Sequence, residues 1–391
     1  MIITVLFSGC APHKELKELS IVKGMGVDLN PNGSYLLTFQ IFNPKSGGGG
    51  GGGTQTSGSS SQSTIIQGSG KSLFDATRNV TMQMGKQLYY SNVSSLIFGK
   101  EICSGKLPEL FDFFERNHEI MPSERVFMAE NRAEDILMAQ NVDGYISAHD
   151  IELIAENNMN TSEVVDQQLK DILKVKNTGM QDFYMGILSM QQNNTSNGQQ
   201  PSQSSGNGGG GSGGSNDTII EAGTAIFHNS KQAGILDDSQ TRGLLWILGE
   251  VHGGLIVVDL KEGGNVSLEI KQAGSSVSMS EKDGKPCADI NIHLESSIGE
   301  IESTNINDYN DTIKDELISL QNQAVKKEAE SAVNIALKKD HSDVFGFGLK
   351  LFEFQPAVWH KLNKSWYNDA EMIPVNINVS STIRHNGLIS K

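Results

Sequence analysis

Two low-complexity tracts divide the 391-residue chain and limit where a folded core can form. The first runs from Ser46 to about Ser63 and consists of a block of glycines followed by Thr, Gln and Ser. The second runs from about Gln191 to Ser215 and is rich in Gln, Asn, Gly and Ser. Neither tract has enough apolar surface to offset the entropy lost on ordering, so we expect both to be mobile.

The two tracts predict different connections. The first lies between two strand-like segments and is interpreted as an elongated hairpin or crossover loop inside one domain. The second separates a helix-rich half from a β-rich half and is interpreted as an interdomain linker. We therefore expect a signal segment at 1–10, an N-terminal domain at 11–190, a linker at 191–216 and a C-terminal domain at 217–391.

The N-terminal half alternates strand and helix signals. Two apolar arms around the Asn30–Gly33 turn predict a β-hairpin, and Ser72 is a good N-cap for a helix that carries Leu73, Ala76 and Val80 on one face. Further strands are expected at 64–67, 93–98 and 123–128, and further helices at 107–116, 133–138, 147–157 and 164–173. This alternation predicts a mixed α/β domain.

The C-terminal half is predicted to be an antiparallel sheet packed with one long amphipathic helix. Its strands are expected from Thr218, at 255–260, 266–270 and 289–294, and at 375–379, where apolar and polar residues alternate. The helix is expected over 309–338, because apolar residues recur there at helical spacing. The segment 344–354 could be strand or helix by composition, and the spacing of Phe345, Leu349 and Phe352 favours a helix. The whole chain is therefore assigned to the α+β class.

Charge and cysteine content restrict the possible partners. The formal net charge is −15 and the pI is near 5.1, which argues against a nucleic-acid surface or a polybasic membrane patch. No window after the first residues has 18 consecutive apolar residues, so no membrane-spanning helix is expected. Cys103 and Cys287 could form a disulfide, but their low number favours two unpaired thiols.

Motifs that resemble catalytic or cofactor sites do not have the residues that such chemistry needs. Gly68–Ser72 ends like a phosphate-binding loop, but Ile65 stands where the first glycine is required, so a turn before a capped helix explains it. Gly249–Gly254 is interpreted as a hairpin turn, and Asp237 and Asp238 as solvated residues of a turn-rich stretch. No histidine pair has metal-ligand spacing and no nucleophile elbow is present. The motifs of the sequence therefore indicate no catalytic site, no metal site and no cofactor.

The stretch Leu6–Cys10 resembles the processing site of a bacterial lipoprotein. An apolar run leads to the small residues Ser8 and Gly9, and the thiol of Cys10 can take a diacylglycerol group after cleavage in front of it. We expect Cys10 to be lipidated and to be the only membrane attachment of the body. The alternative is a short buried segment with an incidental cysteine. Because no Lys or Arg precedes the apolar run, translation is expected to start upstream of Met1.

The order of several short signatures resembles the Ger(x)C family, the lipoprotein C subunits of bacterial spore germinant receptors. They are the run Glu18–Asp28, the segment Ser72–Val80 continuing to Tyr90, the run Phe111–Arg116, Thr241–Trp246 with the sequence T-R-G-L-L-W, and Asp343–Gly348 followed by Pro356, Trp359 and Trp366. The resemblance covers nearly the whole chain outside the two tracts.

This resemblance implies a non-enzymatic lipoprotein subunit on the outer face of the spore inner membrane. It implies that the subunit assembles with two polytopic membrane subunits, of the A and B types, to respond to nutrient germinants. Arg78, Arg116 and Arg242 are candidates for assembly, although internal ion pairs would also explain them. Trp246, Trp359 and Trp366 are expected in the core. The alternative function is a membrane-tethered lipoprotein that itself captures a small solute, in a pocket that sequence cannot reveal.

Overall fold

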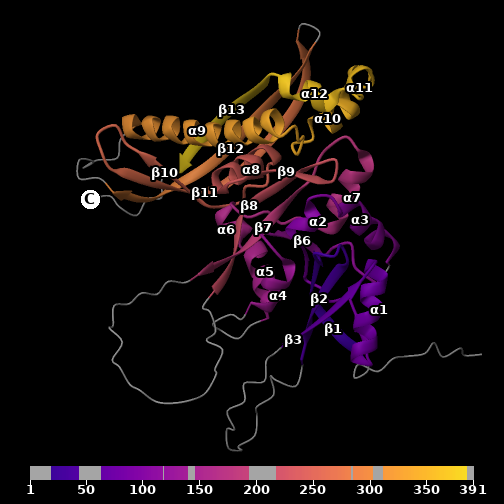
Figure 1. Cartoon of the computed structure of the whole chain (residues 1–391). Helices are drawn as coiled ribbons and strands as arrows, with labels where there is room; N and C mark the ends of the chain where they lie inside the picture. The colour runs from indigo at the N-terminus through magenta and orange to yellow at the C-terminus, as the bar shows by residue number, and fades with distance from the viewer. Residues whose placement is uncertain are drawn as a thin grey trace, which may run out of the picture.

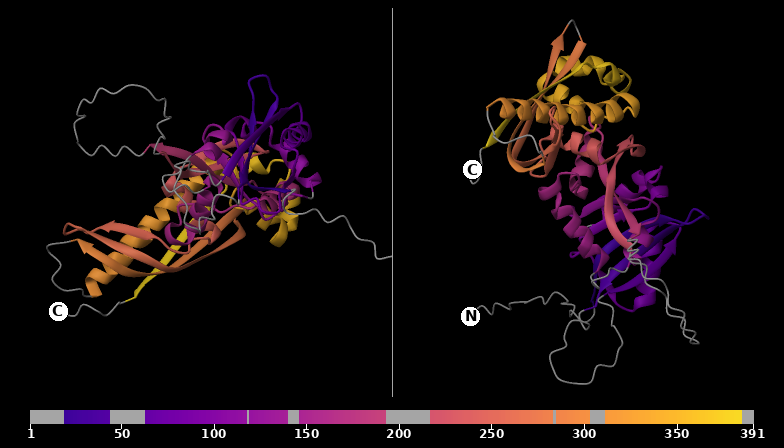
Figure 2. Two further views of the ribbon diagram at one scale, coloured as in Figure 1. Left: turned by 90° about the horizontal axis from the view of Figure 1, so that it is seen from below. Right: turned by 90° about the vertical axis from the view of Figure 1, so that its left-hand side faces the viewer.

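The structure is a computed structural model that describes residues 19–43, 63–117, 119–139, 146–192, 217–282, 285–302 and 311–384. Cys10 and most of both low-complexity tracts lie outside these residues. Two sheets with their helices lie end to end, the N-terminal sheet at the bottom of Figure 1 and the C-terminal sheet at the top. The side view in Figure 2 shows the same two units stacked along the long axis.

The first sheet has nine strands in the described part of the chain, in the order β3-β2-β1-β5-β6-β7-β8-β9 with β4 beside β1. Its centre, from β1 through β5 and β6 to β7, is parallel, and its two sides are antiparallel. The strands are β1 Leu19–Leu29, β2 Tyr35–Phe42, β3 Ser63–Gly70, β4 Gln87–Tyr89, β5 Ser95–Phe98, β6 Arg125–Ala129, β7 Tyr184–Gln192, β8 Asp217–His228 and β9 Lys231–Leu236.

Helices cover both faces of the first sheet. One core joins the sheet to α1, α2, α3 and α7, and a second core on the opposite face joins it to α4 and α5. The helices are α1 Leu73–Met84, α2 Lys100–Cys103, α3 Leu107–Arg116, α4 Ala133–Met138, α5 Ser147–Glu156, α6 Asn158–Thr161 and α7 Leu169–Thr178. The mixed α/β architecture expected for this half is confirmed.

The second sheet is covered on its apolar face by the long helix α9 and by α8. Its strand order is β10-β11-β12-β13. The elements are α8 Asp238–Leu248, β10 Leu255–Asp259, β11 Asn265–Lys282, β12 Lys285–Glu302, α9 Asp311–Val333 continued by a π-helix at Asn334–Lys339, α10 Phe347–Phe354, α11 Pro356–Leu362, α12 Trp366–Asp369, a 3₁₀ turn at Ala370–Met372 and β13 Val375–Arg384. The sheet with one long amphipathic helix was predicted.

Two features of the strand arrangement differ from the sequence-based expectation. The last strand, β13, runs parallel to β12, because the helices from α9 to α12 form a long crossover that returns the chain in the same direction. In addition, β8 and β9 pair with the N-terminal sheet, although they follow the second tract. The pairing partners of a strand depend on distant residues, which local alternation of side chains does not reveal.

Helix α8 was not expected, and it corrects two interpretations. Asp237 is its N-cap and forms a capping box with Gln240, so this aspartate is not simply a solvated turn residue. Gly249 ends the helix in the left-handed conformation, with φ of 76°. The run Gly249–Gly254 is therefore the connection from α8 to β10, and its prediction as a hairpin turn was wrong.

Two other local predictions are confirmed, the N-cap at Ser72 and the unpaired thiols of Cys103 and Cys287. The Ser72 hydroxyl caps α1 by accepting a bond from the Asp75 amide, and Gly68 and Gly70 lie so close to α1 that a Cβ would clash with it. Cys103 and Cys287 are both free and buried. Among the described residues, no helix is both long and apolar enough to cross a membrane.

Candidate functional site

The segment Thr161–Gln168, which runs from the last residue of α6 to the residue before α7, contacts both units and is here called the strap. On the C-terminal side, the Ser162 hydroxyl oxygen accepts bonds from the amides of His252 and Gly253, at 3.1 and 3.3 Å. A Cβ on Gly254 would lie 2.7 Å from the Thr161 carbonyl oxygen, so only glycine allows this close approach. The strap is thus fixed directly to the loop that follows α8.

The strap is also bonded to the first sheet. The Val165 amide donates to the Glu221 carboxylate on β8 at 2.8 Å, and the Asp166 carboxylate pairs with Arg125 of β6 at 2.9 Å. Burial raises the pKa of Glu221 well above its usual value, and the bond from the Val165 amide opposes this shift. The strap therefore holds the sheet and the second unit together.

Arg242 of α8 is the centre of a polar cluster at this junction. Its guanidinium pairs with Glu328 of α9, and both side chains are only 13% exposed. It also contacts Glu163 of the strap and donates to the Leu255 carbonyl oxygen, each at 3.1 Å. The Trp246 indole donates to the same Glu328 carboxylate at 2.9 Å. The Glu328 carboxylate therefore accepts hydrogen bonds from two residues of the run Thr241–Trp246, namely Arg242 and Trp246.

The remaining residues of that run pack against the same elements. The Thr241 hydroxyl donates to Thr224 of β8 at 3.0 Å in a buried position. A Cβ on Gly243 would lie 2.2 Å from the Glu328 carbonyl oxygen, so α8 and α9 touch through backbone at this point. The T-R-G-L-L-W run is therefore the contact surface between α8, α9 and β8.

Asp343 organises the C-terminal helices in a similar way. Its buried carboxylate accepts bonds from the Phe347 and Gly348 amides and from the Trp366 indole, at 3.0, 2.7 and 3.1 Å. Burial raises the pKa of Asp343 to about 6, against the opposing effect of these donors. The Asp343 amide donates to Asp182, next to the start of β7, and thereby links these helices to the first sheet.

The run Glu18–Asp28 also has a structural role where it is described. Gly24 and Gly26 of β1 lie against α4 and α5, where a Cβ would meet Leu137 or Ala133. The Asp28 carboxylate accepts bonds from the amides at the start of α4, so it caps that helix. Burial raises the pKa of Asp28, while the two amides oppose this shift.

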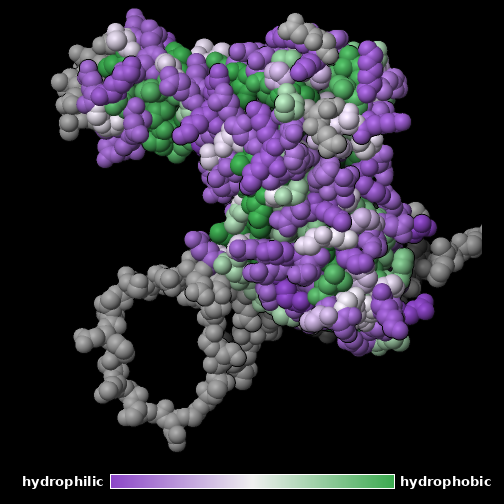
Figure 3. All heavy atoms as spheres, turned by 45° about the horizontal axis from the view of Figure 1, so that its top comes forward, coloured by the Kyte–Doolittle hydropathy of each residue, from purple (hydrophilic) through white to green (hydrophobic). Residues whose placement is uncertain are grey.

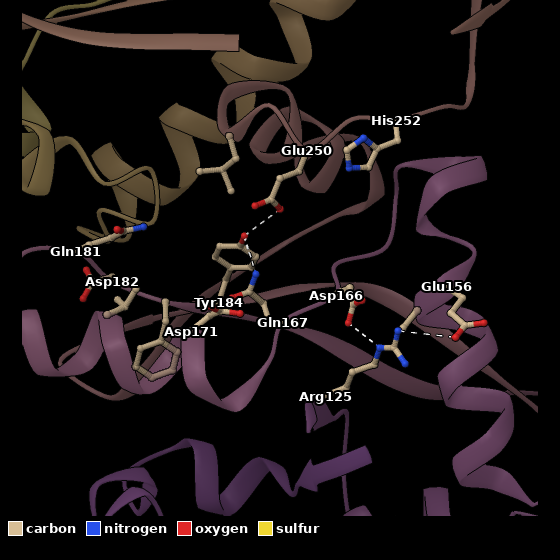
Figure 4. A pocket seen from close by; sticks show the side chains of 14 residues that line it. Arg125, Glu156, Asp166, Gln167, Asp171, Gln181, Asp182, Tyr184, Glu250 and His252 are labelled. Atoms are coloured by element: carbon tan, nitrogen blue, oxygen red, sulfur yellow. Dashed lines mark hydrogen bonds and ion pairs between the residues drawn. The ribbon is translucent and has the colours of Figure 1, made fainter. Parts of the chain in front are cut away.

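A cavity of about 850 Å³ lies beside the strap, between the first sheet and the loop after α8 (Figure 4). Figure 4 shows Glu250 and His252 on one side of it and Arg125, Glu156 and Asp166 on another. The cavity is lined by Arg125, Ala155, Glu156, Asp166, Gln167, Asp171, Val175, Gln181, Asp182, Phe183, Tyr184, Leu248, Glu250 and His252. Carboxylates outnumber cationic side chains in this lining.

The centre of the cavity contains a carboxyl group and a phenol. The Tyr184 hydroxyl lies 3.3 Å from the Glu250 carboxylate and accepts a bond from the Gln167 amide at 2.9 Å. Burial and the nearby Glu250 raise the pKa of Tyr184, and burial raises that of Glu250. Such an arrangement suits a bound cation or hydrogen-bond donor. In the described part of the chain, no group of three or more His, Cys, Asp or Glu side chains could hold a metal ion.

The structure separates the three arginines that were candidates for assembly. Arg242 is internal, as described above. Arg116 is exposed and pairs with Asp112 one turn earlier in α3. Arg78 is exposed on α1. Trp246, Trp359 and Trp366 are all buried, as expected. The partners Glu328, Asp182 and the strap carried no local signal in the sequence, because their roles depend on contacts with distant elements.

Comparison with known proteins is consistent across the chain. Residues 12–190 match the family described as spore germination protein N-terminal domain. Residues 222–387 match the family described as spore germination B3/GerAC like, C-terminal. The spore germination proteins KC and YndF of Bacillus subtilis (strain 168) are 21% and 24% identical to this chain. The alignments cover 98% and 99% of this chain, and 93% and 95% of those proteins.

The fold is also shared with a solved structure. The crystal structure of the GerBC protein superposes with a TM-score of 0.58 at 15% identity, covering 95% of this chain and 100% of that one. Two family models that together span most of the chain, and a fold match over nearly its full length, agree with each other. The chain therefore belongs to the Ger(x)C family, the C subunits of bacterial spore germinant receptors.

Proposed function

We propose that this chain is a non-enzymatic, membrane-tethered subunit that assembles with the polytopic A-type and B-type subunits of a germinant receptor. Lipidation of Cys10 holds it at the outer face of the spore inner membrane. Tethering raises the effective concentration of the body beside its membrane partners, so assembly does not require a tight interface of its own. The domain limits of 11–190 and 217–391, joined by the linker 191–216, are part of this proposal.

The main support for the proposal is the structural role of the residues in the family signatures. Asp28 caps a helix, Arg242 pairs with Glu328, and Asp343 fixes three donors of the C-terminal helices. The Asp28 and Glu328 contacts each lie within one unit, whereas the pair of Arg242 with Glu163 and the bond from the Asp343 amide to Asp182 also join the two units. A body of fixed shape between membrane subunits is what a coupling subunit requires.

The test measures the membrane association and the nutrient response of spores that carry the full chain with Cys10→Ala. We expect the variant to fold, to leave the membrane fraction and to lose the nutrient response that the wild-type chain supports. A germinant response retained at the wild-type level by a non-anchored chain would contradict tethered assembly. A variant that stays wholly in the membrane fraction would contradict attachment by the lipid alone.

Capture of a small solute is a second candidate function, and the junction cavity is the observation that favours it. Its volume suits a small molecule, and its excess of carboxylates suits a compound with an ammonium group. Calorimetric titration of the Cys10→Ala chain with amino acids, sugars and putrescine would test it. Saturable heat that Glu250→Gln removes would favour capture, and absence of heat with every compound would exclude these solutes.

A further inference from the structure

Arg78 on α1 is the one candidate assembly arginine that the fold leaves unpaired. Arg242 forms an ion pair with Glu328, and Arg116 forms an ion pair with Asp112. Arg78 is exposed and forms no hydrogen bond or ion pair with any residue that the structure describes. Its neighbour in the helix, Asn79, donates instead to the Ser69 carbonyl oxygen and so belongs to the contact with β3.

Two large apolar side chains flank Arg78 on the surface of α1. Phe74 is 57% exposed and Met82 is 70% exposed. They lie four residues before and four residues after Arg78, so the three side chains share one face of the helix. We call Phe74, Arg78 and Met82 the α1 stripe. The opposite face of α1, with Leu73, Ala76 and Val80, is buried against the sheet.

The stripe is held on a fixed support. The Phe74 ring packs edge-on against the Phe113 ring of α3, with 4.9 Å between ring centroids. The helix is capped at both ends, by Ser72 and by the left-handed Gly85. Exposed apolar groups on an ordered element often mark an interaction site. The face of the molecule shown in Figure 3 is largely hydrophilic, with apolar side chains in separate patches.

We infer that the α1 stripe docks an amphipathic helix of a polytopic receptor subunit, one that places an Asp or Glu between two apolar side chains. This inference rests on the proposed function and names the surface that would perform the assembly. The unpaired guanidinium selects a carboxylate, with which it can form a two-pronged ion pair. Phe74, Arg78 and Met82 are spaced by four residues, so they form one ridge of α1 of the kind that packs into the groove of another helix.

Charge disfavours the most obvious alternative occupant. The chain carries a net charge of −15, so a second copy would be repelled as a whole. A partner can place one acidic side chain against Arg78 without being repelled by the acidic chain as a whole, provided that the rest of its contact surface is apolar. This is the composition expected at the surface of a membrane subunit.

The stripe also lies at the end of the body where the anchor begins. Just after α1, strand β4 pairs in parallel with Leu19–Ile21, the first described residues of the chain. Cys10 precedes Leu19 by nine positions, and nine residues span at most about 30 Å. Helix α1 is therefore within reach of a partner embedded in the same membrane.

The test compares two charge reversals on exposed helices in the full-length chain. A tagged chain with Arg78→Glu, Arg116→Glu or the wild-type sequence is purified from detergent-solubilised spore membranes, and the bound A-type and B-type subunits are quantified. We expect Arg78→Glu to retain at least about tenfold less of one polytopic subunit. Arg116→Glu should retain the wild-type amount, since Arg116 is already paired. Met82→Asp should reproduce the loss.

Three other results would overturn the inference. Equal recovery of both subunits with Arg78→Glu and Met82→Asp would show that the stripe is not the interface. Binding of the Cys10→Ala chain to phosphatidylglycerol vesicles that Arg78→Glu removes would show that the stripe binds the lipid surface instead. Absence of both subunits even from the wild-type sample would refute the proposed function itself, and the docking surface with it.

Discussion

At the scale of single residues, this protein uses buried polar groups to join elements that are distant in the sequence. The Thr241–Trp246 run was visible as a motif, yet its partner Glu328 lies more than 80 residues later and has no local signature. The same is true of Asp343, whose donors are close in sequence but whose link to Asp182 is not. A motif can be found in the sequence alone, whereas the contacts that explain it can be identified only in the folded structure.

Loss of Glu328 should destabilise the protein strongly. Glu328→Ala leaves Arg242 in a largely buried position with the half-exposed Glu163 as its remaining charged partner, which should cost about 3 kcal/mol of unfolding free energy. Urea unfolding of the Cys10→Ala chain with and without the substitution measures this cost. Asp112→Ala is the control, because it breaks the exposed pair with Arg116 and should change stability by at most about 0.5 kcal/mol. Equal effects of the two substitutions would contradict the assignment of Glu328.

Glu124 makes the stability depend on pH. It is buried with only a backbone donor at Met121, and burial raises its pKa to about 8. The pKa of Glu124 in the folded protein is higher than in the unfolded chain, so the folded protein keeps a proton that the unfolded chain releases. The free energy of unfolding therefore falls as the pH rises towards 8.

Glu124→Gln should remove this loss. The unfolding free energy of the variant minus that of the unsubstituted chain should increase between pH 5 and 8, by up to roughly 1.4 kcal/mol per pH unit. Urea unfolding at a series of pH values measures the difference, with the exposed Glu101→Gln as a control that should show no such trend. A difference that stays constant with pH would mean that Glu124 is ionised in the folded protein.

At the scale of elements, segments with a clear period could be predicted and those placed by distant contacts could not. Helices α1, α3 and α9 follow from apolar spacing, and Ser72 marks the first of them. Helix α8 was missed because its buried residues include the continuous run Gly243–Ile247, in which apolar and polar residues do not recur at helical spacing. The parallel direction of β13 is set by the crossover before it, which no alternation within the strand encodes.

The contact of α8 with α9 depends on the absence of a side chain at Gly243. Replacing a glycine inside a helix by alanine normally stabilises it by up to about 1 kcal/mol. Here a Cβ would meet the α9 backbone at 2.2 Å, so Gly243→Ala should instead destabilise the protein, by about 2 kcal/mol. Thermal or urea unfolding gives the sign. Gly105→Ala, whose Cβ would meet only one atom at 4.0 Å, is the control, and a stabilising Gly243→Ala would refute the close contact.

At the scale of the whole molecule, one apolar core crosses the junction between the sheets. It contains Val165 of the strap and Tyr184 of β7 together with α8, α9 and the second sheet. The sequence suggested two halves separated by a linker. The structure adds that β8 and β9, beyond the linker, complete the first sheet, so the halves are joined by pairing and by packing. Because the two units are joined in this way, a partner bound to α1 at one end of the molecule can affect the position of the unit at the other end.

The central claim is that this body works by contact with polytopic receptor subunits. The most direct measurement places the photoreactive residue benzoylphenylalanine at position 74, on the α1 stripe, in the full-length chain in spores, and identifies the cross-linked products by mass spectrometry. Exposed Val257 on β10, in the other unit, is the control position. The account predicts an adduct with an A-type or B-type subunit from position 74 and none from position 257. Adducts with lipid alone, or no protein adduct from position 74, would contradict it.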